Sequence, residues 1–131
     1  MADTVTSQTI QDGGRTAILK FTNESDGTGE SSVKKVDVSA LAADSDGNAC
    51  TAVTISRIYW ACRGMGVDIE FDASTNVLAI PLPADSTGDE YYDLFTGIPN
   101  NAGSGVTGDI DFTTVGHSNG DAYSIILVLT K

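Results

Sequence analysis

The chain has 131 residues, the length of one ordinary domain, and its 18 acidic and seven basic residues give a formal charge of −11. Of the acids 14 are Asp and only four are Glu, and Thr, Gly, Ala and Ser are abundant, so residues typical of turns and strands outnumber those that fill exposed helix faces. This composition excludes a mostly helical protein, and the negative charge excludes nucleic-acid binding because such a surface repels phosphate.

Short β-rich runs recur along the chain between turn signals rich in Asp, Gly, Ser and Asn. In chain order, strands are expected at residues 4–10, 16–22, 33–38, 52–62, 65–71, 77–82, 110–115 and 122–130, with a further candidate at 91–96. Only 39–43 could form a helical turn, and 99–108 reads as an exposed loop. This pattern predicts a single antiparallel β-sandwich, jelly-roll-like or immunoglobulin-like, of about seven to nine strands. It spans residues 1–131, with 1–12 as a candidate extended N-terminal arm.

The last two strands contain the strongest local signal. Asn119-Gly120 is typical of a two-residue hairpin turn because both residues tolerate positive φ. Such a turn would pair 110–114 with 125–129 and place their large apolar side chains on one face. Ile126 and Val128 then lie on the opposite face and need a cover, either a loop of the same chain or another protein.

A second candidate contact zone is the aromatic segment at 91–95, which contains Tyr91, Tyr92 and Phe95. Aromatic side chains are over-represented at the centres of interfaces, which favours a partner surface. The alternative is that two of them close one end of the sandwich. Both interpretations remain open from the sequence.

Asp44, Asp46 and Asn48 have the one-three-five spacing of a calcium loop. An EF-hand would need Gly and Glu where this chain has Ala49 and Ile55, and Asp-rich turns that bond their own backbone need no metal. We therefore expect no metal and no cofactor, with these three residues as the candidates for a calcium site of another type. Cys50 and Cys62 are expected to be reduced, although neighbouring strands could bring them together.

Two further patterns look catalytic. The 116–120 segment matches G-x-S-x-G, but a strand follows Ser118 where a hydrolase needs a helix, and His117 is the only histidine. The 103–108 segment matches G-x-G-x-x-G without the flanking strand and helix of a dinucleotide site. Lys34-Lys35 is an isolated basic pair among acids. We therefore expect no enzymatic activity.

Targeting signals are also not expected. The first residues lack a basic region followed by an apolar run, so we expect no secretory signal. The longest apolar run, at 125–129, is too short to span a bilayer, so no membrane association is expected.

The whole chain resembles a family of small virion structural proteins of tailed bacteriophages, particularly marine ones. The likeness lies in the segments at 3–10 (DTVTSQTI), 14–27 (GRTAILKFTNESDG), 58–60 (IYW), 98–105 (IPNNAGSG) and 112–117 (FTTVGH). These segments carry no catalytic residues, so none are transferred.

The resemblance implies a particle component that is made in the host cytoplasm and assembled onto a virion. It most resembles a capsid decoration or cement protein, whose partner is the major capsid protein and which acts as a homo-oligomer, a dimer or a trimer. The charge of −11 favours the outside of the shell over its DNA-filled interior. The alternatives are a neck or tail component of the same virion and, from another class, a small calcium-dependent carbohydrate-binding module for host recognition.

Overall fold

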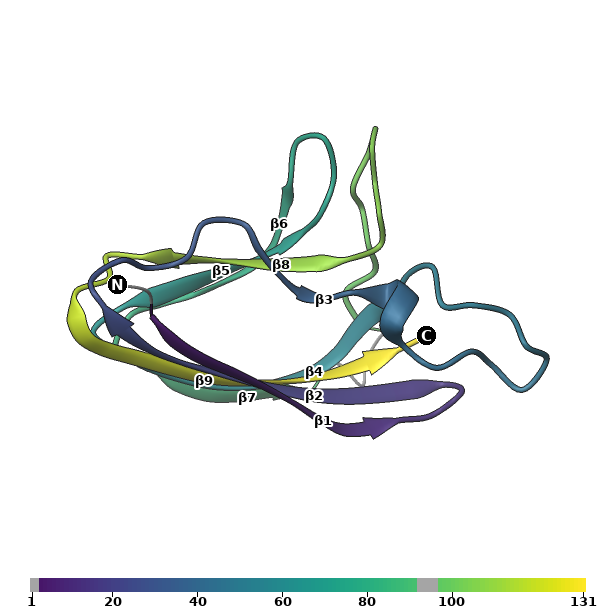
Figure 1. Ribbon diagram of the computed structural model, residues 1–131, viewed down its shortest axis with the longest axis horizontal. Helices are drawn as coiled ribbons and strands as arrows, with labels where there is room; N and C mark the ends of the chain where they lie inside the picture. Colours follow the sequence, from purple (N-terminus) through teal and green to yellow (C-terminus); the bar gives the residue numbers. More distant parts are fainter. Residues whose placement is uncertain (1–2, 92–96) are drawn as a thin grey trace.

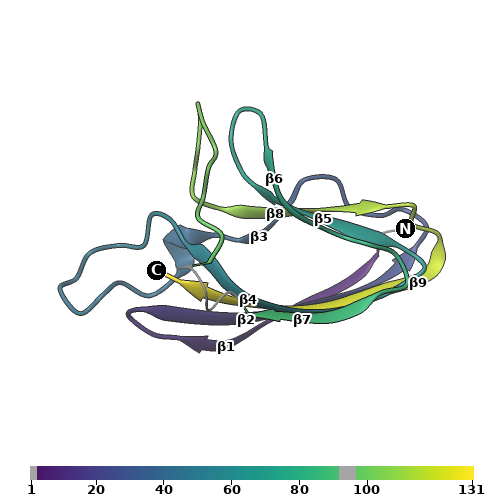
Figure 2. The same cartoon turned by 180° about the vertical axis from the view of Figure 1, so that it is seen from behind.

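The computed structural model describes residues 3–91 and 97–131. Figure 1 shows two layers of antiparallel strands, and Figure 2 shows the same layers from behind. The strands are β1 (Thr4–Asp12), β2 (Thr16–Asp26), β3 (Val33–Val36), β4 (Thr54–Arg63), β5 (Gly66–Phe71), β6 (Val77–Leu82), β7 (Thr87–Tyr91), β8 (Ile110–Val115) and β9 (Asn119–Thr130), with one 3-10 turn, η1 (Val38–Ala40), after β3.

One sheet has five strands in the order β1-β2-β9-β4-β7, and the other has four in the order β3-β8-β5-β6. Every strand pairing is antiparallel. The predicted all-β sandwich is therefore confirmed. Within the N-terminal segment considered as a candidate extended arm, Thr4–Asp12 form an edge strand of the larger sheet.

The core lies between the two sheets and follows from period-two alternation along the strands. In β5, Val67, Ile69 and Phe71 are buried while Asp68 and Glu70 are half-exposed. In β9 the inward set is Tyr123, Ile125, Leu127 and Leu129. An aromatic pair joins the sheets where the ring of Phe112 meets that of Phe21 edge-on, with centroids 5.3 Å apart.

The predicted hairpin between β8 and β9 is wrong. β8 pairs with β3 and β5, whereas β9 pairs with β2 and β4 in the other sheet. The turn exists, because Asp121 N donates to Ser118 O at 3.1 Å, but only Gly120 has a positive φ, of 91°. A type I′ hairpin turn needs positive φ at both central residues, so this turn is of another type. The strand pairings show that it carries the chain from one sheet to the other.

A second difference concerns the strand beside β4. The candidate at 91–96 lies mostly outside the described residues, and the strand that pairs with β4 is Thr87–Tyr91. Gly88 lies against Trp60, where a Cβ would come within 2.4 Å of the indole, so the strand takes a glycine because of this contact.

Candidate functional site

The first candidate site is the free edge of β1. This strand pairs with β2 on one side only, and Thr4–Gln11 contains no charged residue and no proline. Val5 and Ile10 are 46% and 51% exposed. Natural edge strands are commonly protected against pairing by lysine, proline, bulges or short length. Of these β1 has only a shift in register between Thr9 and Gln11.

The other sheet edges differ from β1 in this respect. β7 is five residues long and contains Asp89 and Glu90, β3 is four residues long and contains two lysines, and β6 contains Pro81. Each of these features discourages the addition of a further strand. β1 is thus the edge best suited to pair with a strand from another chain.

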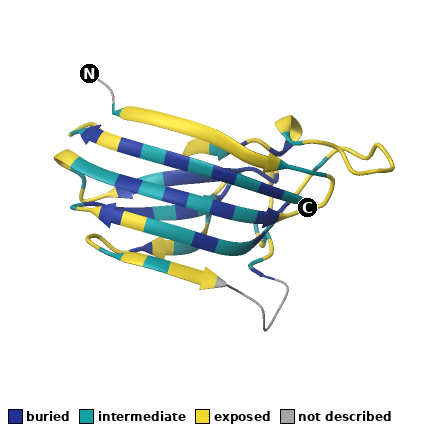
Figure 3. Ribbon diagram, turned by 90° about the horizontal axis from the view of Figure 1, so that it is seen from below, coloured by how far each residue is buried: buried dark blue, intermediate teal, exposed yellow. Residues whose placement is uncertain are grey.

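The second candidate surface is the outer face of the five-stranded sheet. Figure 3 shows this face with no described segment of the chain crossing it. Ile126 and Val128 lie in its central strand and are half-buried. Ile126 is flanked by Lys20 and Tyr59 of the neighbouring strands. Among the residues that the structure describes, these two predicted interface residues are thus flanked by side chains of the same sheet and are not crossed by another segment.

Charge is locally neutralised on this face. Arg57 forms a two-point ion pair with Asp89, with Nε–Oδ1 and Nη2–Oδ2 distances of 3.0 and 2.8 Å. The hydrogen bonds from Arg57 lower the pKa of Asp89. The same guanidinium lies 4.6 Å from the centre of the Tyr59 ring. A half-exposed apolar centre beside a neutralised charge pair is suited to a protein partner.

The predicted aromatic contact zone is only partly described. Tyr91 is the last residue of β7. Tyr92 and Phe95 lie outside the described residues.

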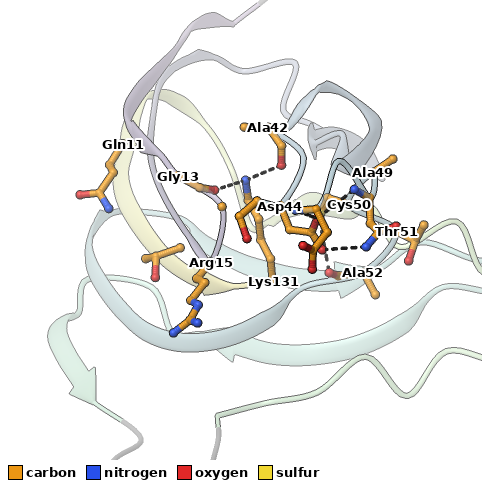
Figure 4. A pocket seen from close by; sticks show the side chains of 15 residues that line it. Gln11, Gly13, Arg15, Ala42, Asp44, Ala49, Cys50, Thr51, Ala52 and Lys131 are labelled. Carbon is orange, nitrogen blue, oxygen red and sulfur yellow. Dashed lines mark hydrogen bonds between the residues drawn. The ribbon is translucent and has the colours of Figure 1, made fainter.

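The three candidate calcium ligands, Asp44, Asp46 and Asn48, line a pocket of about 660 Å³. Figure 4 shows this pocket with Asp44 and Lys131 labelled. Asp44 Oδ1 accepts hydrogen bonds from the backbone N–H of Asp46 and Asn48, both at 2.9 Å, and Oδ2 accepts from Asn48 Nδ2 at 3.2 Å. These bonds from Asn48 and then Asp46 lower the pKa of Asp44. The carboxylate therefore organises its own turn. Among the described residues, no group of three His, Cys, Asp or Glu side chains is arranged to hold a metal ion.

The same pocket contains Lys131, whose side chain is 7% exposed. Its Nζ donates to Asp12 Oδ1 at 2.5 Å and to the carbonyl oxygens of Gly13 and Ala42 at 2.6 and 2.9 Å. The bond from Lys131 lowers the pKa of Asp12. The lysine thus joins three segments of the chain with its three donors.

The cysteines and the serine motif offer no catalytic arrangement in the described chain. Cys50 and Cys62 are both free, and burial raises the pKa of the Cys62 thiol. Ser118 lies in the corner before β9, where its N–H bonds Asp121, and His117 Nδ1 lies 3.1 Å from Thr114 Oγ1. A strand follows the motif, as predicted.

A polar cluster at the opposite end of the sandwich was missed in the sequence. Glu30 Oε1 accepts from Asn23 Nδ2 at 2.9 Å and from the Tyr123 hydroxyl at 2.5 Å, and Glu30 Oε2 forms an ion pair with Lys35. Burial and then the bond to Glu30 raise the pKa of Tyr123, which keeps its hydroxyl a donor. The available signal was Asn23, which occupies an inward position in the alternation Ala17, Leu19, Phe21.

Within the described part of the chain, no helix has the length and apolar character needed to cross a bilayer. No family model matches the sequence, and no curated protein or solved structure matches it.

Proposed function

We propose that this protein is a structural component of a bacteriophage virion, a decoration or cement protein that binds the outside of the major capsid protein shell and stabilises it. The resemblance in the sequence suggests the virion, and the unprotected edge of β1 is the observation that supports attachment by strand addition. The outer face around Ile126 and Val128 supplies a second contact surface.

The mechanism is non-covalent bridging. The β1 edge would form backbone hydrogen bonds with a strand of a capsid subunit or of a second copy of this chain, as a dimer or trimer on the particle. Residues 4–11 carry no charge, so no local charge repulsion from these residues opposes the pairing of this strand with another chain. The apolar centre of the outer face would be buried against the neighbouring subunit.

The first test locates the chain in purified virions of the phage that encodes it, by mass spectrometry and by cryo-electron microscopy of the particle. Density for the sandwich on the outer shell at regular positions is the expected result. Density confined to the neck or tail would replace the capsid assignment, and absence from the particle would overturn the proposal.

The second test changes the contact surfaces. We expect Val5→Lys with Ile10→Lys, at the exposed edge, to reduce occupancy on the particle at least about tenfold, since edge lysines oppose strand addition. Val128→Asp should also reduce occupancy, by desolvating a charge in the interface. Val106→Lys is the matched control, because Val106 is 50% exposed but lies outside both surfaces. Circular dichroism checks that each variant is folded, and wild-type occupancy of both surface variants would contradict this attachment.

A further inference from the structure

Three residues with complementary chemistry meet in the interior at one end of the sandwich. The Lys35 and Glu30 side chains are 5% and 6% exposed, and Asn23 is 2% exposed. They are an amine, a carboxylate and a carboxamide in one water-excluded site. Burial of these polar groups is unfavourable unless they are paired with one another.

The fold brings these residues together from both sheets. Asn23 lies on the inward face of β2, opposite Tyr123 of β9. Lys35 is the extra residue at a register shift between Lys34 and Val36 of β3, and bulges of this kind redirect a side chain, often at functional sites. The 27–32 loop between the two strands carries Glu30.

Glu30 is held in place by its backbone. Its N–H donates to Thr114 Oγ1 at 2.8 Å, and its carbonyl oxygen accepts from Thr114 N at 2.9 Å. The carboxylate therefore has a fixed position between the other two groups. Its Oε2 contacts Lys35 Nζ and its Oε1 contacts Asn23 Nδ2 at 2.9 Å. A single carboxylate thus touches both the nitrogen that could attack and the nitrogen that could leave.

We propose that Lys35 and Asn23 condense into an intramolecular amide bond that covalently joins the two sheets, with Glu30 as the catalytic proton carrier. The reaction needs no oxidant, metal or cofactor. Lysine is a nucleophile once it is neutral, and a correctly placed acid–base group accelerates proton transfers of this kind.

Glu30 takes one proton from the Lys35 ammonium, and the amine lone pair forms a bond to Cγ of Asn23 while the carbonyl π electrons move to Oδ1. Glu30 then protonates Nδ2 and accepts the remaining excess proton from Nζ. Collapse of the tetrahedral carbon restores the carbonyl, breaks the Cγ–Nδ2 bond and releases ammonia, which takes the proton from Glu30 and leaves as ammonium.

The surroundings favour this chemistry over a permanent ion pair. Asp3 Oδ2 accepts a second hydrogen bond from Asn23 Nδ2 at 3.1 Å, so both protons of the leaving nitrogen are held by carboxylates. Asn23 Oδ1 is buried with no hydrogen-bond partner among the described residues. Because the two oxygens of Glu30 hold the amine and the carboxamide, the reaction is intramolecular, for which effective concentrations of well-oriented groups reach roughly 10⁵–10⁸ M.

The test is the intact mass of the purified full-length protein, measured after denaturation and reduction. We expect a mass lower than that of the sequence by one ammonia molecule. Trypsin does not cleave after an acylated lysine, so peptides 21–34 and 35–57 should be recovered as one joined species. A full mass with separate linear peptides would show an ion pair only and would overturn the proposal without any variant.

Two variants and a control identify the chemistry. Lys35→Arg and Glu30→Gln should each restore the lost ammonia, because the first removes the nucleophile and the second the proton carrier. Lys34→Arg is the matched control, since Lys34 is half-exposed, pairs with Asp109 and should leave the cross-link intact. A succinimide at Asn119-Gly120 would also lose ammonia, but it would survive Lys35→Arg and leave peptides 21–34 and 35–57 unjoined. That result would equally overturn the proposal.

The cross-link would form in the isolated chain, whether or not the chain joins a virion. A cross-linked protein absent from every particle would refute the proposed function alone, and a particle component of full mass would refute the cross-link alone.

Discussion

The two ends of the sandwich each bury a lysine against a carboxylate, and the two sites differ in what surrounds the ammonium. Lys131 bonds Asp12 and two backbone carbonyl oxygens, which are inert acceptors. Lys35 faces Glu30, which also holds the carboxamide of Asn23. The same residue type therefore fastens the C-terminal residue to the β1–β2 turn and to Ala42 at one site and is placed for a reaction at the other. The two sites differ because the carboxylate of Glu30 also binds the carboxamide of Asn23.

The two sites also differ in exposure. The Asp12 side chain is 22% exposed, whereas that of Glu30 is 6% exposed. Asp12 can therefore recover water if its lysine is removed, and Glu30 cannot. An isolated buried charge costs far more than one that reaches solvent, so the two lysines should not contribute equally to stability.

The largest expected change in stability comes from replacing each of the two buried lysines. Lys35→Met should lower the free energy of unfolding by about 3–5 kcal/mol, because it removes the donor that Lys35 gives the buried Glu30, as an ammonium or, after condensation, as an amide N–H, together with the cross-link itself. Lys131→Met should lower it by about 1–2 kcal/mol, the cost of unmade bonds at a partly hydrated site. Urea denaturation measures both. The double variant Lys35→Met with Glu30→Gln should recover part of the loss, and equal losses at the two ends would contradict the comparison.

A smaller effect is expected at the glycines in the loops of the two ends. Gly29 has φ 74°, and an added Cβ would lie 2.3 Å from His117 Nε2, whereas Gly47 has φ 83° with no atom within 4 Å of such a Cβ. Gly29→Ala should therefore cost about 2–3 kcal/mol and Gly47→Ala about 1 kcal/mol, the backbone contribution alone. Thermal unfolding measures the difference. Adding His117→Ala to Gly29→Ala should remove the steric part; no recovery would show that the His117 contact is unimportant.

The smallest expected effect comes from a buried carboxylate whose neighbour is another acid. Burial, and then the hydrogen bond with Asp72, raise the pKa of Asp111 to about 6. The folded state therefore binds this proton more tightly than the unfolded state, and its stabilising contribution is lost as the pH rises from about 4 to about 6. Asp111→Asn should raise the melting temperature at about pH 7.5 by the equivalent of about 1 kcal/mol, and hardly change it at about pH 4.5.

Asn76 Nδ2, which donates to Asp111 Oδ2 at 3.0 Å, can still donate to an asparagine oxygen there. Acids with a lowered pKa, such as Asp12 and Asp89, stabilise the fold less as the pH falls. They are present in the wild type and in the Asp111→Asn variant alike. The difference between variant and wild type therefore isolates Asp111. A variant that is equally stabilised at both pH values would contradict the role of its ionisation.

Much of the fold could be predicted because strand faces follow from local alternation. The inward set of β9 and the outward Ile126 and Val128 depend only on parity, and parity is preserved whichever strands are neighbours. The partner of β9 was predicted wrongly, because Asn119-Gly120 specifies a turn but not the sheet that the next strand enters. That choice depends on long-range packing around β2 and β4.

For the candidate sites too, local features could be predicted from the sequence, whereas their position in the fold could not. An uncharged N-terminal strand is visible in the sequence, but its place at an edge depends on the whole topology. The Asn23, Glu30 and Lys35 cluster was missed because a register shift in β3 changes the direction of Lys35. Asn23 lies twelve positions before Lys35 in the sequence, in β2 of the five-stranded sheet, whereas Lys35 lies in β3 of the four-stranded sheet. Such a meeting follows from tertiary structure and not from any local pattern.

Strand β1 is fastened at both of its ends. Asp3, just before it, accepts from Asn23, Ser25 and the backbone of the 26–29 turn, and Asp12, its last residue, is held by Lys131 and by the N–H of Ala42. A force applied along this strand would therefore load its ladder with β2 and both anchors together, in shear, and would not peel the pairs apart one by one. The strand offered to a neighbour is thus also the one through which the domain can carry tension.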